Sequence, residues 1–185
     1  MDDEQNLTAW VVYESFFGNT ESIAGAIASG LRLEHVAATA LDVADAGVGE
    51  TDGCDLLVVG GPTHAFALSR PSTRDDAMAR GGDDRYAGGG LREWLSALPV
   101  QDGTRLAAVF DTRVRMVRHL PASAARSAAH LMRQHRFTLI ARPTGFLVHD
   151  VEGPLDQREM ERAVAWGRSL AREAQERIAA GREPA

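Results

Sequence analysis

The chain has 185 residues, which is enough for one well-packed domain but short for two independent cores. Its 44% hydrophobic and 25% charged residues are typical of a soluble globular protein. The net charge of −6 argues against nucleic acid as the main partner, and the arginines at 113, 115 and 118 are the one local exception. We therefore predict one domain over residues 1–185, with a frayed terminus at residues 1–6.

The sequence also excludes several other classes of protein. Cys54 is the single cysteine, so no intramolecular disulfide forms, and its thiol fits a reducing cytosol. No stretch resembles a signal peptide, and no apolar run approaches the ~20 residues that span a bilayer. The histidines show no spacing with other ligand residues that is typical of a metal site. We therefore expect a cytoplasmic protein without membrane or metal.

Apolar runs and helical periodicities alternate along the chain, from a near-continuous apolar run at residues 8–13 to a long periodic segment at the C-terminus. The predicted strands are 8–13, 36–41, 56–59, 106–110 and one last strand, 137–140 with 145–148, interrupted around Pro143. The predicted helices are 19–33, 91–98, 122–134 and 160–178. Five such alternations favour a parallel sheet with helices on both faces.

The connection after the third strand is unusually long. Periodicity is lost from residue 63 to residue 90, and glycines cluster at 81–82 and 88–90. A connection of this length in a compact domain is usually functional or mobile. We predict a long glycine-rich loop over residues 67–90, which is open enough to act as a substrate lid.

Polar loops follow the first, third and fourth strands, at residues 15–20, 60–66 and 111–118. In such sheets, ligands bind beyond the carboxyl ends of the strands, where the strand order reverses. Three polar loops at that edge predict a pocket.

The loop at residues 15–20 has the composition of an anion site. Between a strand and a helix, it presents backbone N–H groups at a helix N-terminus, and Gly18 permits a tight turn. Ser15, Asn19 and Thr20 add side-chain donors. The loop has no lysine or arginine, so neutral donors and the helix dipole would hold a phosphate. The alternative is that Asn19 or Thr20 merely caps the helix.

Residues 11–21 resemble the phosphate-binding signature of flavodoxins and flavodoxin-like flavoproteins, in which a hydroxyl-x-x-Gly-Asn-Thr loop holds the phosphate of FMN. Residues 60–64, Gly-Gly-Pro-Thr-His, resemble the loop after the third strand in flavodoxin-like oxidoreductases. The resemblance implies an α/β, flavodoxin-like doubly wound sandwich. Its sheet would be five-stranded and parallel, in the order 2-1-3-4-5, with helices on both faces.

The resemblance also implies a set of FMN contacts, with the phosphate in the first loop and the ring between the other two. The implied cofactor-binding residues are Ser15, Phe16, Phe17, Gly18, Asn19, Thr20, Pro62, Thr63, His64, Ala65, Phe66, Asp111, Thr112 and Arg113. Flavodoxins often stack the flavin between two aromatic side chains. Phe66 is one candidate, but residues 111–118 contain no Tyr, Trp or Phe, which indicates a more open flavin site.

Structural interpretations of these residues stay open beside the functional one. His64 is alternatively a surface turn residue, and Phe66 a side chain packed beneath its loop. Asp111 is alternatively a turn cap. The three arginines are alternatively a solvated face; if functional, they would receive an acidic partner or substrate. A P-loop NTPase is excluded because Asn19 stands where its lysine is required.

The resemblance implies electron transfer through bound FMN, with a redox partner protein or a nicotinamide as electron donor. We expect an electron-transfer flavoprotein more readily than a dedicated enzyme and assign no catalytic residue. One alternative is an interaction module whose pocket is empty or binds FMN weakly. Another is an NAD(P)H:quinone reductase. The sequence leaves the oligomeric state open.

Overall fold

A computed structural model describes residues 7–182, apart from the side chains at 50, 52, 117 and 182. The terminus predicted to fray lies outside this range. The strands are β1 (Thr8–Tyr13), β2 (Ala37–Asp42), β3 (Leu56–Pro62), β4 (Leu106–Val114), β5 (Thr138–Leu139) and β6 (Thr144–Val148). The helices are α1 (Asn19–Leu33), α2 (Pro71–Ala79), α3 (Leu91–Ala97), α4 (Ala124–Gln134) and α5 (Gln157–Arg182). Short 3₁₀ turns lie at Val48–Gly53, Asp84–Tyr86 and Arg115–Val117.

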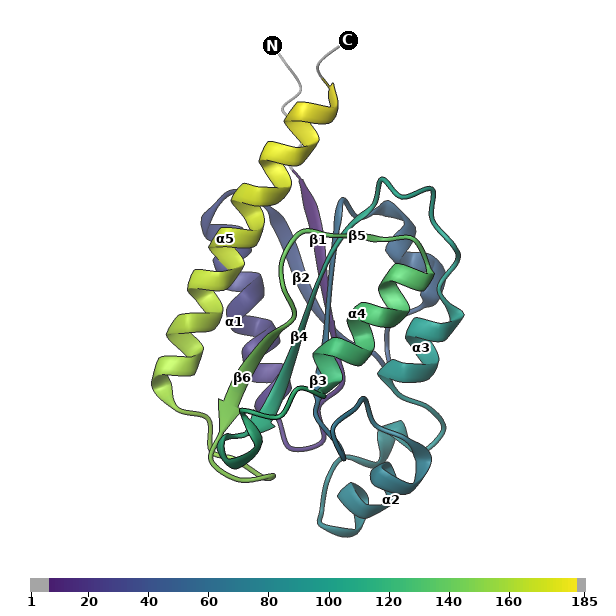
Figure 1. The fold of residues 1–185 in the computed structure, drawn as a ribbon, viewed down its shortest axis with the longest axis vertical. Helices are drawn as coiled ribbons and strands as arrows, with labels where there is room; N and C mark the ends of the chain where they lie inside the picture. Colours follow the sequence, from purple (N-terminus) through teal and green to yellow (C-terminus); the bar gives the residue numbers. More distant parts are fainter. Residues whose placement is uncertain (1–6, 183–185) are drawn as a thin grey trace.

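The strands form one parallel sheet in the order β2-β1-β3-β4-β5, which confirms the predicted topology (Figure 1). The last position of the sheet is shared, because β5 pairs with the start of β4 and β6 with its end. The predicted interruption of the last strand is therefore confirmed. Pro143 lies in the break, where its missing N–H costs no ladder hydrogen bond.

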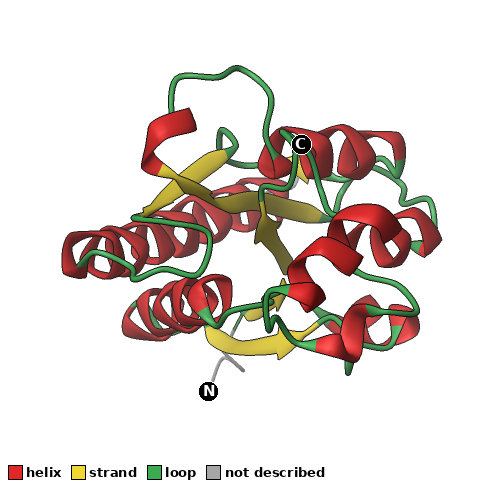
Figure 2. Ribbon diagram, turned by 90° about the horizontal axis from the view of Figure 1, so that it is seen from below, coloured by secondary structure: helices red, strands yellow, loops and turns green. Residues whose placement is uncertain are grey.

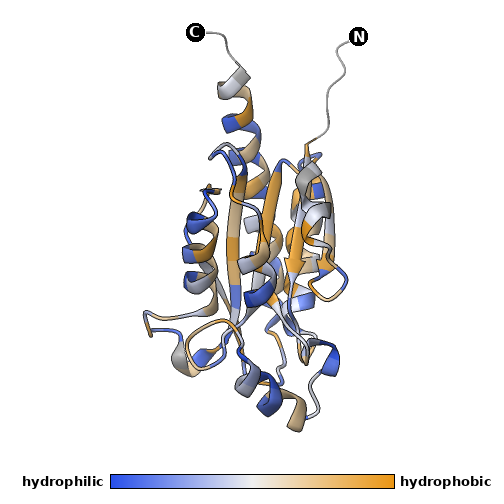
Figure 3. Ribbon diagram, turned by 90° about the vertical axis from the view of Figure 1, so that its right-hand side faces the viewer, coloured by the Kyte–Doolittle hydropathy of each residue, from blue (hydrophilic) through white to orange (hydrophobic). Residues whose placement is uncertain are grey.

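The two faces of the sheet bury separate hydrophobic clusters, as period-2 strands covered on both sides require. In Figure 3 hydrophobic colours predominate along the central strands of the sheet. Val11 and Val58 point to the face covered by α1 and α5, whereas Val12 and Val59 point to the face of α3 and α4. On the first face, α1 and α5 touch backbone to backbone. A Cβ added at Gly30 would lie 2.1 Å from a carbonyl oxygen of α5, so this crossing requires glycine.

The predicted open loop at residues 67–90 is wrong, because α2 and a 3₁₀ turn occupy much of it. Pro71 begins the helix at a position where its missing N–H has no helical partner to lose. Only Arg74 and Ala77 of α2 are buried, so the helix has almost no apolar periodicity to recognise. Viewed from below, Figure 2 looks onto the end of the molecule where α2 lies, which is also where the parallel strands end.

Across residues 7–182, no helix combines the length and the apolar character needed to cross a bilayer.

Candidate functional site

The loop after β1 leaves the N-terminus of α1 without a protein cap. Gly18 is the N-cap residue and has φ 78°, a left-handed conformation that favours glycine. It offers no side chain, and neither Asn19 nor Thr20 caps the helix, so the capping alternative is wrong. Within the described residues, the amides of residues 16–21 donate to no protein acceptor. These N–H groups, at the positive end of the helix dipole, suit an external anion.

Tyr86 holds the start of this loop in place. The Ser15 amide donates to the Tyr86 hydroxyl over 3.1 Å, and that hydroxyl donates to Asp42 over 2.7 Å. Burial, followed by the bond to Asp42, raises the pKa of Tyr86 well above its usual range, so the hydroxyl keeps its proton. The Phe16 ring packs edge-on against Tyr86 and His64, with centroids 4.9 and 5.1 Å away. The loop is therefore fixed by its neighbours rather than by a bound ligand.

A cavity of about 270 Å³ lies beside the loop, at the carboxyl ends of the strands. This volume is close to the lower limit of ~300 Å³ for ligand pockets, so a larger ligand would be partly exposed. The lining residues come from the loops after β1, β3 and β6, from the end of β4 and from α2. They are Ser15, Phe16, Phe17, Asn19, Thr20, Pro62, Thr63, His64, Ala65, Thr73, Asp76, Ala77, Arg80, Thr112, Arg113, Val114, Val148 and Val151.

The structure brings eleven of the fourteen predicted residues to the cavity wall. The three that do not line it are Gly18, Phe66 and Asp111. Gly18 acts through its backbone conformation, whereas Phe66 and Asp111 point elsewhere. The hydroxyls of Thr20 and Thr112 share a hydrogen bond of 2.8 Å, which joins the first loop to the end of β4.

Two polar atoms of the cavity wall lack a hydrogen-bond partner. Ser15 Oγ and His64 Nε2 are both inaccessible to solvent and contact no protein donor or acceptor. A buried polar group left in this state costs ~1–3 kcal/mol unless a ligand or water satisfies it. Burial also lowers the pKa of His64, which favours a neutral imidazole at pH 7. His64 lines the cavity and also begins the turn that its backbone closes with Ala67, so it is a turn residue and a cavity residue at once.

The turn after His64 is strained. Ala65 and Phe66 have φ values of 45° and 67°, and two backbone hydrogen bonds between His64 and Ala67 close the turn. Two consecutive positive φ angles normally require glycine or asparagine. This geometry turns the Phe66 ring outward to 49% exposure, so the ring is not packed beneath its loop.

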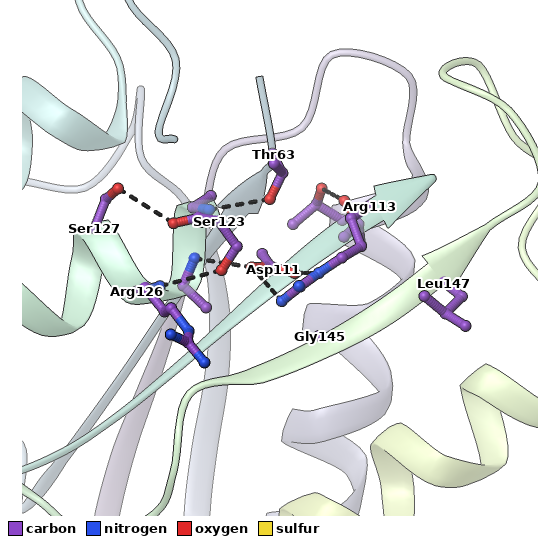
Figure 4. A network of polar contacts seen from close by, with 12 residues as sticks. Thr63, Asp111, Arg113, Ser123, Arg126, Ser127, Gly145 and Leu147 are labelled. Carbon is purple, nitrogen blue, oxygen red and sulfur yellow. Dashed lines mark hydrogen bonds and ion pairs between the residues drawn. The ribbon is translucent and has the colours of Figure 1, made fainter. Parts of the chain in front are cut away.

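Asp111 instead belongs to the network shown in Figure 4. Its carboxylate is fully buried, and it accepts two hydrogen bonds from Arg113 at 2.7 and 2.9 Å. It also accepts the Ala125 amide at the start of α4 over 3.0 Å. The Arg113 guanidinium lies over Gly145, where an added Cβ would approach it to 2.6 Å. The alternative of a turn cap is wrong for Asp111, because its carboxylate accepts an amide in the first turn of α4, whose N-cap residue is Ser123.

Sequence reasoning missed the α2 wall and the valines at the opposite side. The missed lining residues are Thr73, Asp76, Ala77, Arg80, Val114, Val148 and Val151. Arg80 adds a cation that the first loop lacks. Pro71 is the only local signal of α2, and it gives no indication that the helix folds back over the loop after β1.

A buried glutamate anchors the connection between β3 and α3 to the sheet. Glu14, 1% exposed, accepts the Leu91 amide over 2.7 Å. Burial raises the pKa of its carboxyl, which makes Glu14 easier to protonate than an exposed glutamate. Nearby, Arg74 of α2 pairs with Glu93 over 3.1 Å. These contacts hold the connection between β3 and α3 at its middle and at its end.

The described residues contain no group of three or more His, Cys, Asp or Glu side chains that could hold a metal ion. The donors at the cavity are instead amides, hydroxyls, an imidazole and two guanidiniums. This set suits a phosphate ester attached to a partly apolar ring system.

No family model and no curated protein matches the sequence. Solved structures do. An archaeal flavodoxin superposes with a TM-score of 0.64 at 19% identity, over 91% of this chain and 99% of the other. Flavodoxin 2 from Bacillus cereus superposes with a TM-score of 0.64 at 17% identity, over 91% of this chain and 98% of the other. The flavodiiron core of Flv1 from Synechocystis sp. PCC6803 superposes with a TM-score of 0.61 at 17% identity, over 94% of this chain but only 37% of the other. The chain therefore has a flavodoxin-like fold.

Proposed function

We propose that this flavodoxin-like protein binds FMN at the carboxyl ends of its strands and transfers electrons between partners. The phosphate would be bound at the open N-terminus of α1, and the flavin ring would occupy the cavity between His64 and the end of β4. Bound FMN supplies the redox chemistry, since it accepts and returns electrons. The protein's own part is to bind, orient and shield the cofactor, so no acid or nucleophile needs to be assigned.

One observation carries the proposal: the N-terminus of α1 has free amides and an unpartnered Ser15 hydroxyl at one cavity wall. Leaving the buried Ser15 hydroxyl unsatisfied is costly for the protein, and together with the amides that donate to no protein group it favours a ligand that accepts several hydrogen bonds at once. A phosphate dianion has three such oxygens. Its charge is favoured by the helix dipole. Of the charged residues at the cavity wall, Arg113 is already paired with Asp111, and Arg80 is accompanied by the carboxylate of Asp76.

The flavin ring would meet two unlike surfaces. His64 and Pro62 provide a flat wall on the β3 side, whereas Val114, Val148 and Val151 provide an aliphatic wall opposite. A neutral His64 can exchange a hydrogen bond with the polar edge of the ring without adding charge. Since Phe66 lies outside the cavity, aromatic stacking contributes less than it would between two rings.

Titration of the apoprotein with FMN and with riboflavin tests the proposal, because the two ligands differ only in the phosphate. We expect the fluorescence of FMN to be quenched on binding. FMN should bind at least about tenfold more tightly than riboflavin, a difference in binding free energy of ~1.4 kcal/mol. Inorganic phosphate should compete with FMN. Photoreduction of the complex should then bleach the flavin reversibly. Equal affinity for both ligands would contradict the phosphate site.

The exposed Phe66 favours one second candidate, an interaction module with an empty or weakly FMN-binding pocket. The same titration separates the two, because the module would leave the fluorescence of added FMN unchanged.

A further inference from the structure

Charge is distributed very unevenly along this acidic chain. Between residues 112 and 149 there are seven arginines and no aspartate or glutamate, although the net charge of the whole chain is −6. This stretch runs from the end of β4 through α4 to the end of β6. The rest of the molecule is correspondingly more acidic than the net charge alone suggests.

Five of these seven arginines line two clefts on the β6 side of the sheet. One cleft, of about 350 Å³, is lined by Arg113, Arg118, His119 and Arg162, with Glu159 as its only carboxylate. A second cleft, of about 410 Å³, lies between α4 and the β5–β6 link and is lined by Arg126, Ala129, Arg133, Arg142 and Pro143. Arg113 lines both the first cleft and the proposed cofactor cavity, so the basic surface reaches the cavity rim.

Four of these arginines form what we call the arginine face: Arg118, Arg126, Arg133 and Arg142. All four are exposed, and none forms an ion pair with any carboxylate in the described residues. The contrast with α5 is clear, because Arg168 and Arg172 there pair with Glu34 at 2.6 and 2.9 Å. Unpaired like charges side by side lower stability slightly, so the folding of this chain does not account for the arginine face.

Exposed apolar side chains lie on the loops at the carboxyl ends of the strands, in the same region as Arg118 at the end of the arginine face. Phe66, Met116, Leu120 and Val151 are 49%, 88%, 43% and 40% exposed, and all four lie on loops that follow β3, β4 or β6. They make up four of the six exposed large hydrophobic residues in the described chain. An apolar centre with a charged rim, rich in Met and Arg, is typical of protein–protein interfaces.

We propose that the arginine face and these apolar loops dock a protein with an acidic surface, which exchanges electrons with the cofactor. The choice of a redox partner rests on the proposed function, and the choice of an acidic one rests on the unpaired arginines. Nucleic acid fits less well, because a duplex offers no surface for the four apolar side chains and the net charge of −6 opposes it.

Binding to the apoprotein tests the docking without any flavin signal. The acidic probe is a plant-type [2Fe–2S] ferredoxin, the basic probe is cytochrome c, and calorimetry is run at about 20 and about 200 mM salt. The screening length falls from above ~10 Å to below ~8 Å between these conditions. We expect ferredoxin to bind at low salt, to bind at least about tenfold more weakly at high salt, and to bind more tightly than cytochrome c.

The variants locate the surface. Combining Arg126→Gln, Arg133→Gln and Arg142→Gln should weaken ferredoxin binding at least about tenfold. The matched control combines Arg168→Gln, Arg172→Gln and Arg177→Gln, which removes the same charge from ion-paired positions of α5 and should change the affinity less than about twofold. Equal losses in both variants, no binding of ferredoxin, or tighter binding to a DNA duplex or to phosphatidylserine vesicles would overturn the proposal. If ferredoxin binds but FMN does not, the docking surface stands and the proposed cofactor role fails.

Discussion

The N-termini of α1 and α4 lie at the same edge of the sheet and are treated in opposite ways. At α4, Ser123 Oγ accepts the Arg126 amide, Asp111 accepts the Ala125 amide and Thr63 Oγ1 accepts the Ala124 amide, at 3.3, 3.0 and 3.0 Å. At α1, the N-cap is a glycine with no side chain to offer. One helix end is saturated by the protein's own groups, and the other is left open.

The difference indicates which of the two helix ends is available to bind an external anion. Both helix ends carry a positive partial charge, worth ~0.3–1 kcal/mol to a nearby anion. Asp111 of β4 supplies α4 with a buried carboxylate, which leaves no role for an external anion. The first turn of α1 contains Glu21, but its amides have no protein acceptor, so their binding energy remains available to a ligand.

Removing the internal anion should give the largest effect. Asp111→Ala leaves Arg113 half-buried without its carboxylate and frees the Ala125 amide. Breaking a buried pair in this way costs ~3–5 kcal/mol, which urea denaturation would register as a lower midpoint. Asp111→Asn still provides an acceptor for α4 and should lose less. If Asp111→Ala unfolded at the same urea concentration as the parent, the cap at α4 would be unimportant.

The equivalent change at α1 should affect binding and not stability. Ser15→Ala removes a hydroxyl that has no protein partner, so the free energy of unfolding of the apoprotein should stay the same or rise slightly. FMN should bind more weakly by ~1–3 kcal/mol, the value of a hydrogen bond to a desolvated phosphate.

Ser22→Ala is the matched control for this test. The Ser22 hydroxyl donates to the Gly18 carbonyl and does not line the cavity. Its removal should change the affinity for FMN by less than about twofold relative to the parent protein, a difference in binding free energy below ~0.4 kcal/mol. Equal effects of the two substitutions would argue that the loop acts as a unit, without a specific contact at Ser15.

The same two helix ends show which features could be predicted from the sequence and which could not. The open loop at α1 was predictable because all of its determinants are local: a strand, six consecutive residues and a helix. The role of Asp111 was not, because it depends on the amide of Ala125, fourteen positions later, and on α4 folding back onto β4. The sequence did not predict α2, and the reason is different. Its two buried residues, Arg74 and Ala77, create no apolar stripe, and its contacts with the cavity are all long-range.

Adding a carboxylate to the first turn of α1, which already contains Glu21, should make the two helix ends more alike. Asn19→Asp is nearly isosteric and places a negative charge in the first turn, where the dipole stabilises it by ~0.3–1 kcal/mol. The thermal midpoint of the apoprotein should therefore rise, while FMN affinity falls about tenfold, or ~1.4 kcal/mol, because the two anions repel. An unchanged affinity would place the phosphate away from this turn.

The smallest effect concerns strain at the opposite wall of the cavity. Ala65 has φ 45°, a conformation that costs an L-residue ~1–2 kcal/mol and glycine almost nothing. Ala65→Gly should therefore stabilise the protein by ~0.5 kcal/mol, after the ~0.4–1 kcal/mol that glycine loses through its more flexible unfolded chain. Ala67→Gly, at a position without positive φ, should instead destabilise it. Opposite signs for two alanines two residues apart would show that the turn beside His64 is held under strain by the rest of the fold. Equal losses would show that the turn is relaxed.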